Sequence, residues 1–118
     1  MKKLIVLFLI LFSFNAYAAK EVLAPTTSAG QSSLFSLKTG QTVTIMLDDA
    51  VCVAGEYSDV QYSFDSGISW VDLKYEGTQI RLHCTNNMVT VYGAGIFRVD
   101  KEATTNATGI YISRDGDL

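Results

Sequence analysis

The chain has 118 residues, and its 12 acidic against 9 basic side chains give a formal net charge of −3. Binding to nucleic acid needs lysine and arginine gathered into a patch, and the sequence contains no such cluster. The same shortage of basic residues argues against an anionic membrane surface as partner. One domain of this length can bury a modest hydrophobic core.

Residues 1–18 have the order of a secretory signal peptide. Two lysines precede an apolar run over 4–14, and small residues follow at Ala16 and Ala18. The run is shorter than the roughly 20 residues of a membrane-spanning helix, so we expect cleavage after Ala18 rather than retention as an anchor. The mature product is then periplasmic or secreted, with no membrane insertion after cleavage. Loss of the two lysines changes its formal charge from −3 by −2 to −5.

The mature chain contains two cysteines, Cys52 and Cys84. An even number of cysteines in an exported chain is typical of disulfide bonding, and two cysteines allow one pairing. Closing a loop of this length contributes about 3–4 kcal/mol in the chain-entropy model. The alternative is a pair of buried free thiols.

The mature chain divides into a polar first segment and a domain with alternating hydrophobicity. Small polar residues and the single proline over 19–33 predict a flexible segment, in which Val22 and Leu23 are candidates for a short first strand. Over 34–118, apolar residues recur at every second position in short β-branched or aromatic runs, as half-buried strands require. The predicted inward-facing sets are Val43, Ile45 and Leu47; Val60, Tyr62 and Phe64; Ile80, Leu82 and Cys84; Val89 and Val91; Phe97 and Val99; and Ile110 and Ile112.

Turn residues separate these runs, and no sustained helical period occurs after the signal. Short strands at this spacing predict an all-β domain. We expect a small antiparallel β-sandwich, or a partly open barrel, of about 7–8 strands over 34–118.

The segment 63–70 reads Ser-Phe-Asp-Ser-Gly-Ile-Ser-Trp and resembles the Asp-box of sialidase-like propellers and other secreted β-proteins. Its physical chemistry suits a hairpin that begins at Ser63. Asp65 can accept hydrogen bonds from the N–H groups of its own turn, and Gly67 can take a positive φ at little cost. Trp70 is expected to fold under the turn as an apolar plug. The single copy predicts a structural hairpin and not glycosidase activity.

A second resemblance covers about residues 78 to 113. This stretch contains the glycine turn Gly93-Ala94-Gly95, the strand Phe97-Arg98-Val99 and a Thr/Ala-rich link over 103–108 before a final strand. In these features it resembles small β-structured accessory or decoration proteins of tailed bacteriophages. The resemblance implies a phage-encoded or prophage-encoded origin.

The sequence offers no catalytic, cofactor-binding or metal-binding residue set. The single histidine, His83, is expected on a solvent-facing strand position, and a structural zinc site needs about four ligands. We expect Trp70, Phe64 and Phe97 in the core.

Exposed tyrosines are favoured at interfaces, which makes Tyr75, Tyr92 and Tyr111 candidates for a partner surface. The alternative is that they are ordinary strand tyrosines.

These patterns predict an exported, non-enzymatic binding protein that needs no cofactor and contacts a protein or a glycan of the cell envelope. One alternative is a phage virion accessory protein, such as a decoration or fibre subunit. Another is a small carbohydrate-active enzyme that uses a pair of its carboxylates.

Overall fold

The described part of the chain consists of β-strands and connecting turns. A computed structural model describes residues 19–49 and 53–114, and the statements below concern these residues. They contain no helix, hence none that spans a membrane. All strand pairs are antiparallel. The predicted signal peptide at 1–18 lies outside the described residues.

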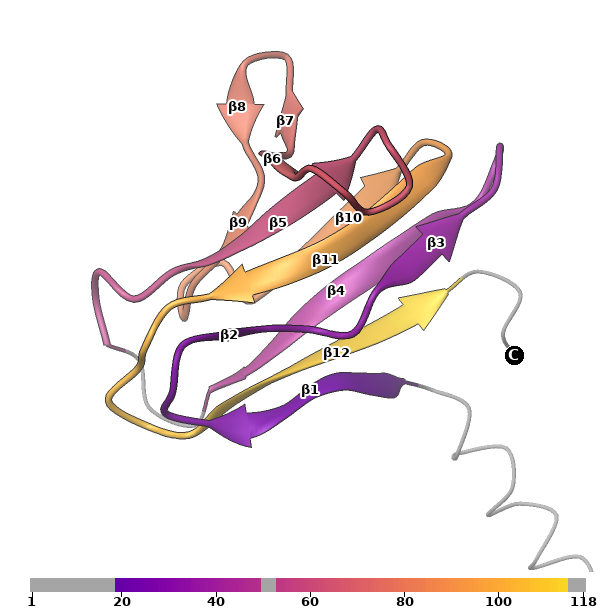
Figure 1. Ribbon diagram of the computed structural model, residues 1–118. Helices are drawn as coiled ribbons and strands as arrows, with labels where there is room; N and C mark the ends of the chain where they lie inside the picture. The colour runs from indigo at the N-terminus through magenta and orange to yellow at the C-terminus, as the bar shows by residue number, and fades with distance from the viewer. Residues whose placement is uncertain (1–18, 50–52, 115–118) are drawn as a thin grey trace, which may run out of the picture.

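The first sheet has four strands in the order β1-β12-β4-β10 (Figure 1). They are β1 (Lys20–Thr26), β12 (Thr108–Arg114), β4 (Thr42–Asp49) and β10 (Met88–Tyr92). The central pair β12 and β4 is in register over seven residues, from Thr108 opposite Asp49 to Arg114 opposite Val43. Its β-branched, alternating sequences fit a sheet that is buried on one face.

The second sheet packs against the first, with its long strands running in nearly the same direction (Figure 1). It follows the order β2-β11-β5-β6, with β3 also paired to β11 and β9 to β5. Its strands are β2 (Gly30–Gln31), β3 (Phe35–Leu37), β5 (Ser58–Ser63), β6 (Val71–Asp72), β9 (Arg81–Leu82) and β11 (Gly95–Lys101). A separate hairpin is formed by β7 (Lys74–Tyr75) and β8 (Thr78–Gln79). Seven of the strands have three or more residues, and the other five are two-residue pairings.

The hydrophobic core lies between the two sheets. The predicted inward positions are buried on the long strands of both sheets, and the largest fully buried side chains include Ile45, Ile110, Val60 and Phe97. The predicted all-β, sandwich-like fold is therefore confirmed, and alternation is the sequence property that specifies it.

The structure differs from the expected flexible segment over 19–33. Its residues form β1 and β2, and Val22 is buried in the core with its carbonyl accepting a hydrogen bond from the N–H of Ser33 at 2.8 Å. The edge position of β1 explains why Pro25 is tolerated there, because the missing N–H of proline does not interrupt an inner ladder. Two register shifts in the β1–β12 pairing absorb the irregularity.

Two further features depart from the sequence reading. Phe64, expected in the core, is 66% exposed because β5 ends at Ser63 and the alternation stops there. Conversely, Phe35 and Leu37 are buried core residues on β3, a three-residue strand too short to produce a recognisable pattern.

Candidate binding site

The Asp-box segment forms the turn between β5 and β6, whose antiparallel pairing places Tyr62 opposite Val71. The Asp65 Oδ1 atom accepts hydrogen bonds from the N–H of Ser69 at 2.7 Å and from the Ser63 hydroxyl at 3.0 Å. Because the Ser69 N–H stabilises the charged carboxylate, the pKa of Asp65 lies below its ordinary value.

The same turn is closed from its other side by the Ser63 hydroxyl, which accepts a hydrogen bond from the N–H of Gly67 at 2.7 Å. Gly67 has a φ of +90°, the conformation that the sequence pattern predicts for this position. The carboxylate of Asp65 is therefore engaged in hydrogen bonds within its own turn.

Trp70 lies beside this turn but outside the buried core. The ring is partly exposed, and the guanidinium of Arg98 lies 4.3 Å from its centroid. A Cβ atom at Gly67 would lie 3.9 Å from Trp70 Cζ2, which places the ring against the turn as expected. The expectation of a core position is wrong, because Arg98 and solvent replace apolar neighbours around the indole.

Large apolar side chains of the hairpin remain exposed. Ile68 is 83% exposed, Phe64 66% and Val71 46%, and Leu34 reaches the same turn near Gly67. Exposed apolar side chains that gather in one place mark an interaction surface. We call these four residues the hairpin patch: Leu34, Phe64, Ile68 and Val71.

A pocket of about 200 Å³ lies at the turn between β10 and β11. It is lined by Tyr62, Leu73, Tyr92, Gly93, Ala94 and Phe97. The rings of Tyr62 and Phe97 meet with centroids 5.4 Å apart. This arrangement requires glycine at position 95. The φ of Gly95 is +153°, which other residues rarely adopt, and a Cβ atom there would overlap the Tyr62 ring. We call this the β10–β11 pocket.

Two of the three tyrosines singled out from the sequence meet beside this pocket. The rings of Tyr75 and Tyr92 stack with centroids 4.3 Å apart and an interplanar angle of 8°. Burial raises the pKa of Tyr75. Tyr111 lies apart from them on β12, where its hydroxyl donates to the Glu21 carboxylate at 3.2 Å. The predicted surface of three tyrosines is therefore a pair and a separate residue.

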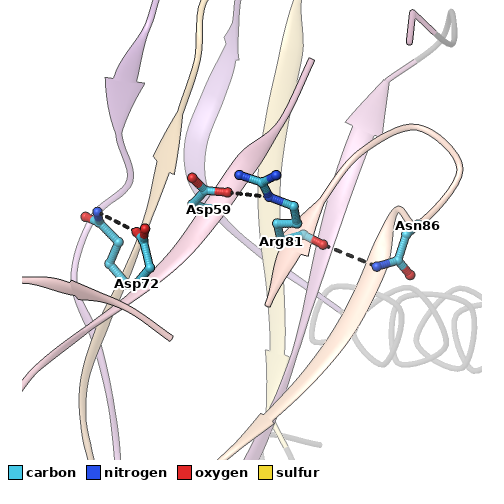
Figure 2. A network of polar contacts seen from close by, with 5 residues as sticks. Asp59, Asp72, Arg81 and Asn86 are labelled. Carbon is cyan, nitrogen blue, oxygen red and sulfur yellow. Dashed lines mark hydrogen bonds and ion pairs between the residues drawn. The ribbon is translucent and has the colours of Figure 1, made fainter. Parts of the chain in front are cut away.

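Charged residues gather around β5 and β9. Arg81 donates from Nε to Asp59 Oδ1 at 2.9 Å, and Asn86 donates from Nδ2 to the Arg81 carbonyl at 3.2 Å (Figure 2). The hydrogen bond to Asp59 raises the pKa of Arg81. The guanidinium also lies 4.3 Å from the centroid of the Tyr57 ring. Farther along β5, Gln61 donates a hydrogen bond to Asp72 on β6 at 3.2 Å (Figure 2).

Next to Arg81 is a second pocket of about 170 Å³. It is lined by Val53, Ala54, Gly55, Tyr57, His83, Cys84 and Thr85. His83 is half-buried, not solvent-facing as expected, because its ring meets Tyr57 edge-on and its Nδ1 lies 2.7 Å from the Thr85 hydroxyl. Within residues 19–49 and 53–114, no group of three or more His, Cys, Asp or Glu side chains is placed to hold a metal ion.

Cys84 lines this second pocket, with its Sγ 3.9 Å from the carbonyl oxygen of Val53. Cys52 lies outside the described residues, so the pairing of Cys52 with Cys84 stays a prediction. Val53 directly follows Cys52 in the sequence, so the residue next to Cys52 is in contact with Cys84.

No family model, curated protein or solved structure matches this chain. The resemblance to phage accessory proteins therefore stays a prediction from the sequence.

Proposed function

We propose that the mature chain is an exported binding protein whose β10–β11 pocket receives an apolar side chain of a protein partner at the cell envelope. The observation that carries this proposal is the pocket itself, which is concave, lined by aromatic and aliphatic groups, and of a size suited to one large side chain.

The surroundings of the pocket support a protein partner. The turns β5–β6 and β10–β11 lie at the same end of the molecule (Figure 1), so the hairpin patch and the pocket belong to one region. An apolar pocket beside exposed apolar side chains matches the centre of a protein interface, where aromatic anchors are enriched.

The chemistry of the lining favours protein over glycan. Among the six lining residues, the polar side-chain groups are the hydroxyls of Tyr62 and Tyr92. A sugar ring presents many hydroxyls that need hydrogen-bonding partners, whereas an apolar side chain needs none. The lining also lacks the carboxylate pair that glycoside hydrolysis requires, which favours binding over catalysis.

The test is a pull-down from envelope extract with mass spectrometry of the retained material. Ala94→Arg places a long charged side chain at the exposed rim of the pocket without removing any packing atom. Ala103→Arg makes the same change at another exposed alanine, in the link between β11 and β12. We expect Ala94→Arg to lower retention of the partner at least about tenfold and Ala103→Arg to leave it unchanged.

Equal retention by both variants would contradict the pocket as the binding site. Retention of a polysaccharide that survives protease treatment of the extract would make the partner a glycan.

A further inference from the structure

Strand β10 forms one edge of its sheet, and the direction of its backbone groups follows from its pairing. The described residues pair it only with β4, with Thr90 opposite Thr44. The carbonyl of Asn87 accepts a hydrogen bond from the N–H of Leu47 on β4 at 2.8 Å. Backbone groups alternate along a strand, so those of residues 88, 90 and 92 point away from β4, toward the open edge.

One of these outward-facing residues is already paired with a side chain. The Tyr75 hydroxyl donates to the carbonyl oxygen of Tyr92 at 2.8 Å and accepts from the N–H of Tyr92 at 3.0 Å. A single hydroxyl thus satisfies both outward groups of Tyr92, as a residue of a neighbouring strand would. The stacked rings hold the hydroxyl in this position.

The β7–β8 hairpin presents this hydroxyl. Its turn has two residues with positive φ, Glu76 at 53° and Gly77 at 80°. Positive φ at both central residues is the geometry of a tight two-residue hairpin turn. Tyr75 directly precedes this turn, pairs with Thr78, and so is carried by a short, well-defined element.

Among the described residues, β10 lacks three features that commonly protect sheet edges from other chains, namely charged side chains, proline and a register shift. Its sequence, Met-Val-Thr-Val-Tyr, contains no charge and no proline. The opposite edge of the same sheet, β1, contains Pro25, two charged residues and two register shifts. A side chain that occupies the backbone groups of β10 would therefore prevent this edge from pairing with a strand of another chain.

We infer that β10 is a self-association edge and that the Tyr75 hydroxyl competes with a second copy of this chain for it. Two β10 strands can pair antiparallel about Thr90, which places the exposed Met88 of one copy opposite the exposed Tyr92 of the other. The uncharged strands meet without repulsion, and the methionine–tyrosine pairs add sulfur–aromatic contacts. This pairing requires both outward groups of Tyr92, which are the groups that Tyr75 holds.

The experiment measures the self-association of the purified exported chain by analytical ultracentrifugation. Tyr75→Phe removes the competing hydroxyl and keeps the stacked ring. We expect it to tighten self-association at least about tenfold, the effect of freeing two hydrogen-bonding groups. Tyr111→Phe removes another hydrogen-bonded tyrosine hydroxyl, on β12, and is expected to leave self-association unchanged.

A second substitution tests whether the association uses β10. Thr90→Pro removes an N–H that points to the open edge and leaves the ladder to β4 intact. We expect the double variant Tyr75→Phe/Thr90→Pro to lose the gain. If Tyr75→Phe does not fold by circular dichroism, Tyr75→Leu replaces it with the same expectation.

The inference is overturned by a Tyr75→Phe chain no more associated than the unsubstituted one, by a gain that survives Thr90→Pro, or by an equal gain in Tyr111→Phe. A monomeric Tyr75→Phe chain whose Thr90 amide is protected from hydrogen exchange by another envelope protein would also overturn it, because the occupant would then be a different chain.

Discussion

Asp65 is half-buried, and its carboxylate is hydrogen-bonded within the turn that surrounds it. Its pKa is lowered chiefly by the hydrogen bond from the N–H of Ser69. A carboxylate with a lowered folded-state pKa stabilises the fold above its unfolded value near 3.8, and this contribution is lost as pH falls through the folded-state pKa.

We therefore predict that Asp65→Asn lowers the melting temperature at neutral pH, and that the difference from the unsubstituted chain shrinks below about pH 4. Thermal unfolding of both proteins, followed by circular dichroism from about pH 2 to about pH 7, measures this difference in melting temperature. A constant difference over the whole range would show that the charge of Asp65 does not stabilise the turn.

Trp70 has one face under Arg98 and one edge against the turn, so it supports the hairpin from outside the core. Trp70→Ala removes a partly buried ring and a cation–π contact, and we expect it to cost about 1–2 kcal/mol of unfolding free energy. The alternative role is stacking on a sugar ring. Urea unfolding separates the two, since a sugar-binding Trp70 would lower glycan retention with no change in the unfolding midpoint.

At the scale of elements, the β10–β11 hairpin depends on a residue with no side chain. Gly95 combines a φ of +153° with direct contact to the Tyr62 ring. Gly95→Ala is expected to cost about 2–4 kcal/mol, because it adds both backbone strain and an overlap that displaces Tyr62. Displacement of Tyr62 also deforms the β10–β11 pocket, so partner retention is expected to fall beyond the loss of folded protein.

Gly30→Ala is the matched control for Gly95→Ala. A Cβ atom at Gly30 meets nothing within 4 Å, and its φ is not in the left-handed region. Denaturant unfolding of both variants compares the two sites directly. Similar costs for the two substitutions would refute the role assigned to Gly95.

How far the sequence predicts these elements depends on how long each pattern runs. β4, β11 and β12 have seven or eight residues, and their alternation predicted the buried faces correctly. The predicted core position of Phe64 was wrong, because β5 ends one residue earlier, at Ser63, where the Asp-box turn begins. Phe35 was missed because three residues do not establish a period.

The candidate site was predicted less completely than the fold. Tyr75 and Tyr92 were selected as exposed tyrosines, but their stacking depends on a hairpin of two-residue strands with no recognisable pattern. Leu73 is the single residue between β6 and β7, and its position in the pocket follows only from tertiary packing. Pockets that form between loops distant in sequence have no local sequence signal.

At the scale of the whole molecule, two of the connections that pass between the sheets contain the two cysteines in their sequence. The connection from β4 to β5, which contains Cys52, leaves the first sheet for the second. The connection from β9 to β10, which contains Cys84, returns to the first sheet. A bond between Cys52 and Cys84 would therefore join two inter-sheet crossings and hold the sandwich together at one end.

We expect thiol labelling of the unfolded, unreduced protein to find no free cysteine. Reduction should lower the free energy of unfolding by about 3–4 kcal/mol, because the open chain gains conformational entropy mainly in the unfolded state. The double variant Cys52→Ala/Cys84→Ala controls for the reductant, since it should show the lowered stability without treatment and no further change with it. Two labelled thiols in freshly purified protein, or a reduced protein as stable as the oxidised one, would mean that core packing alone holds the two sheets together.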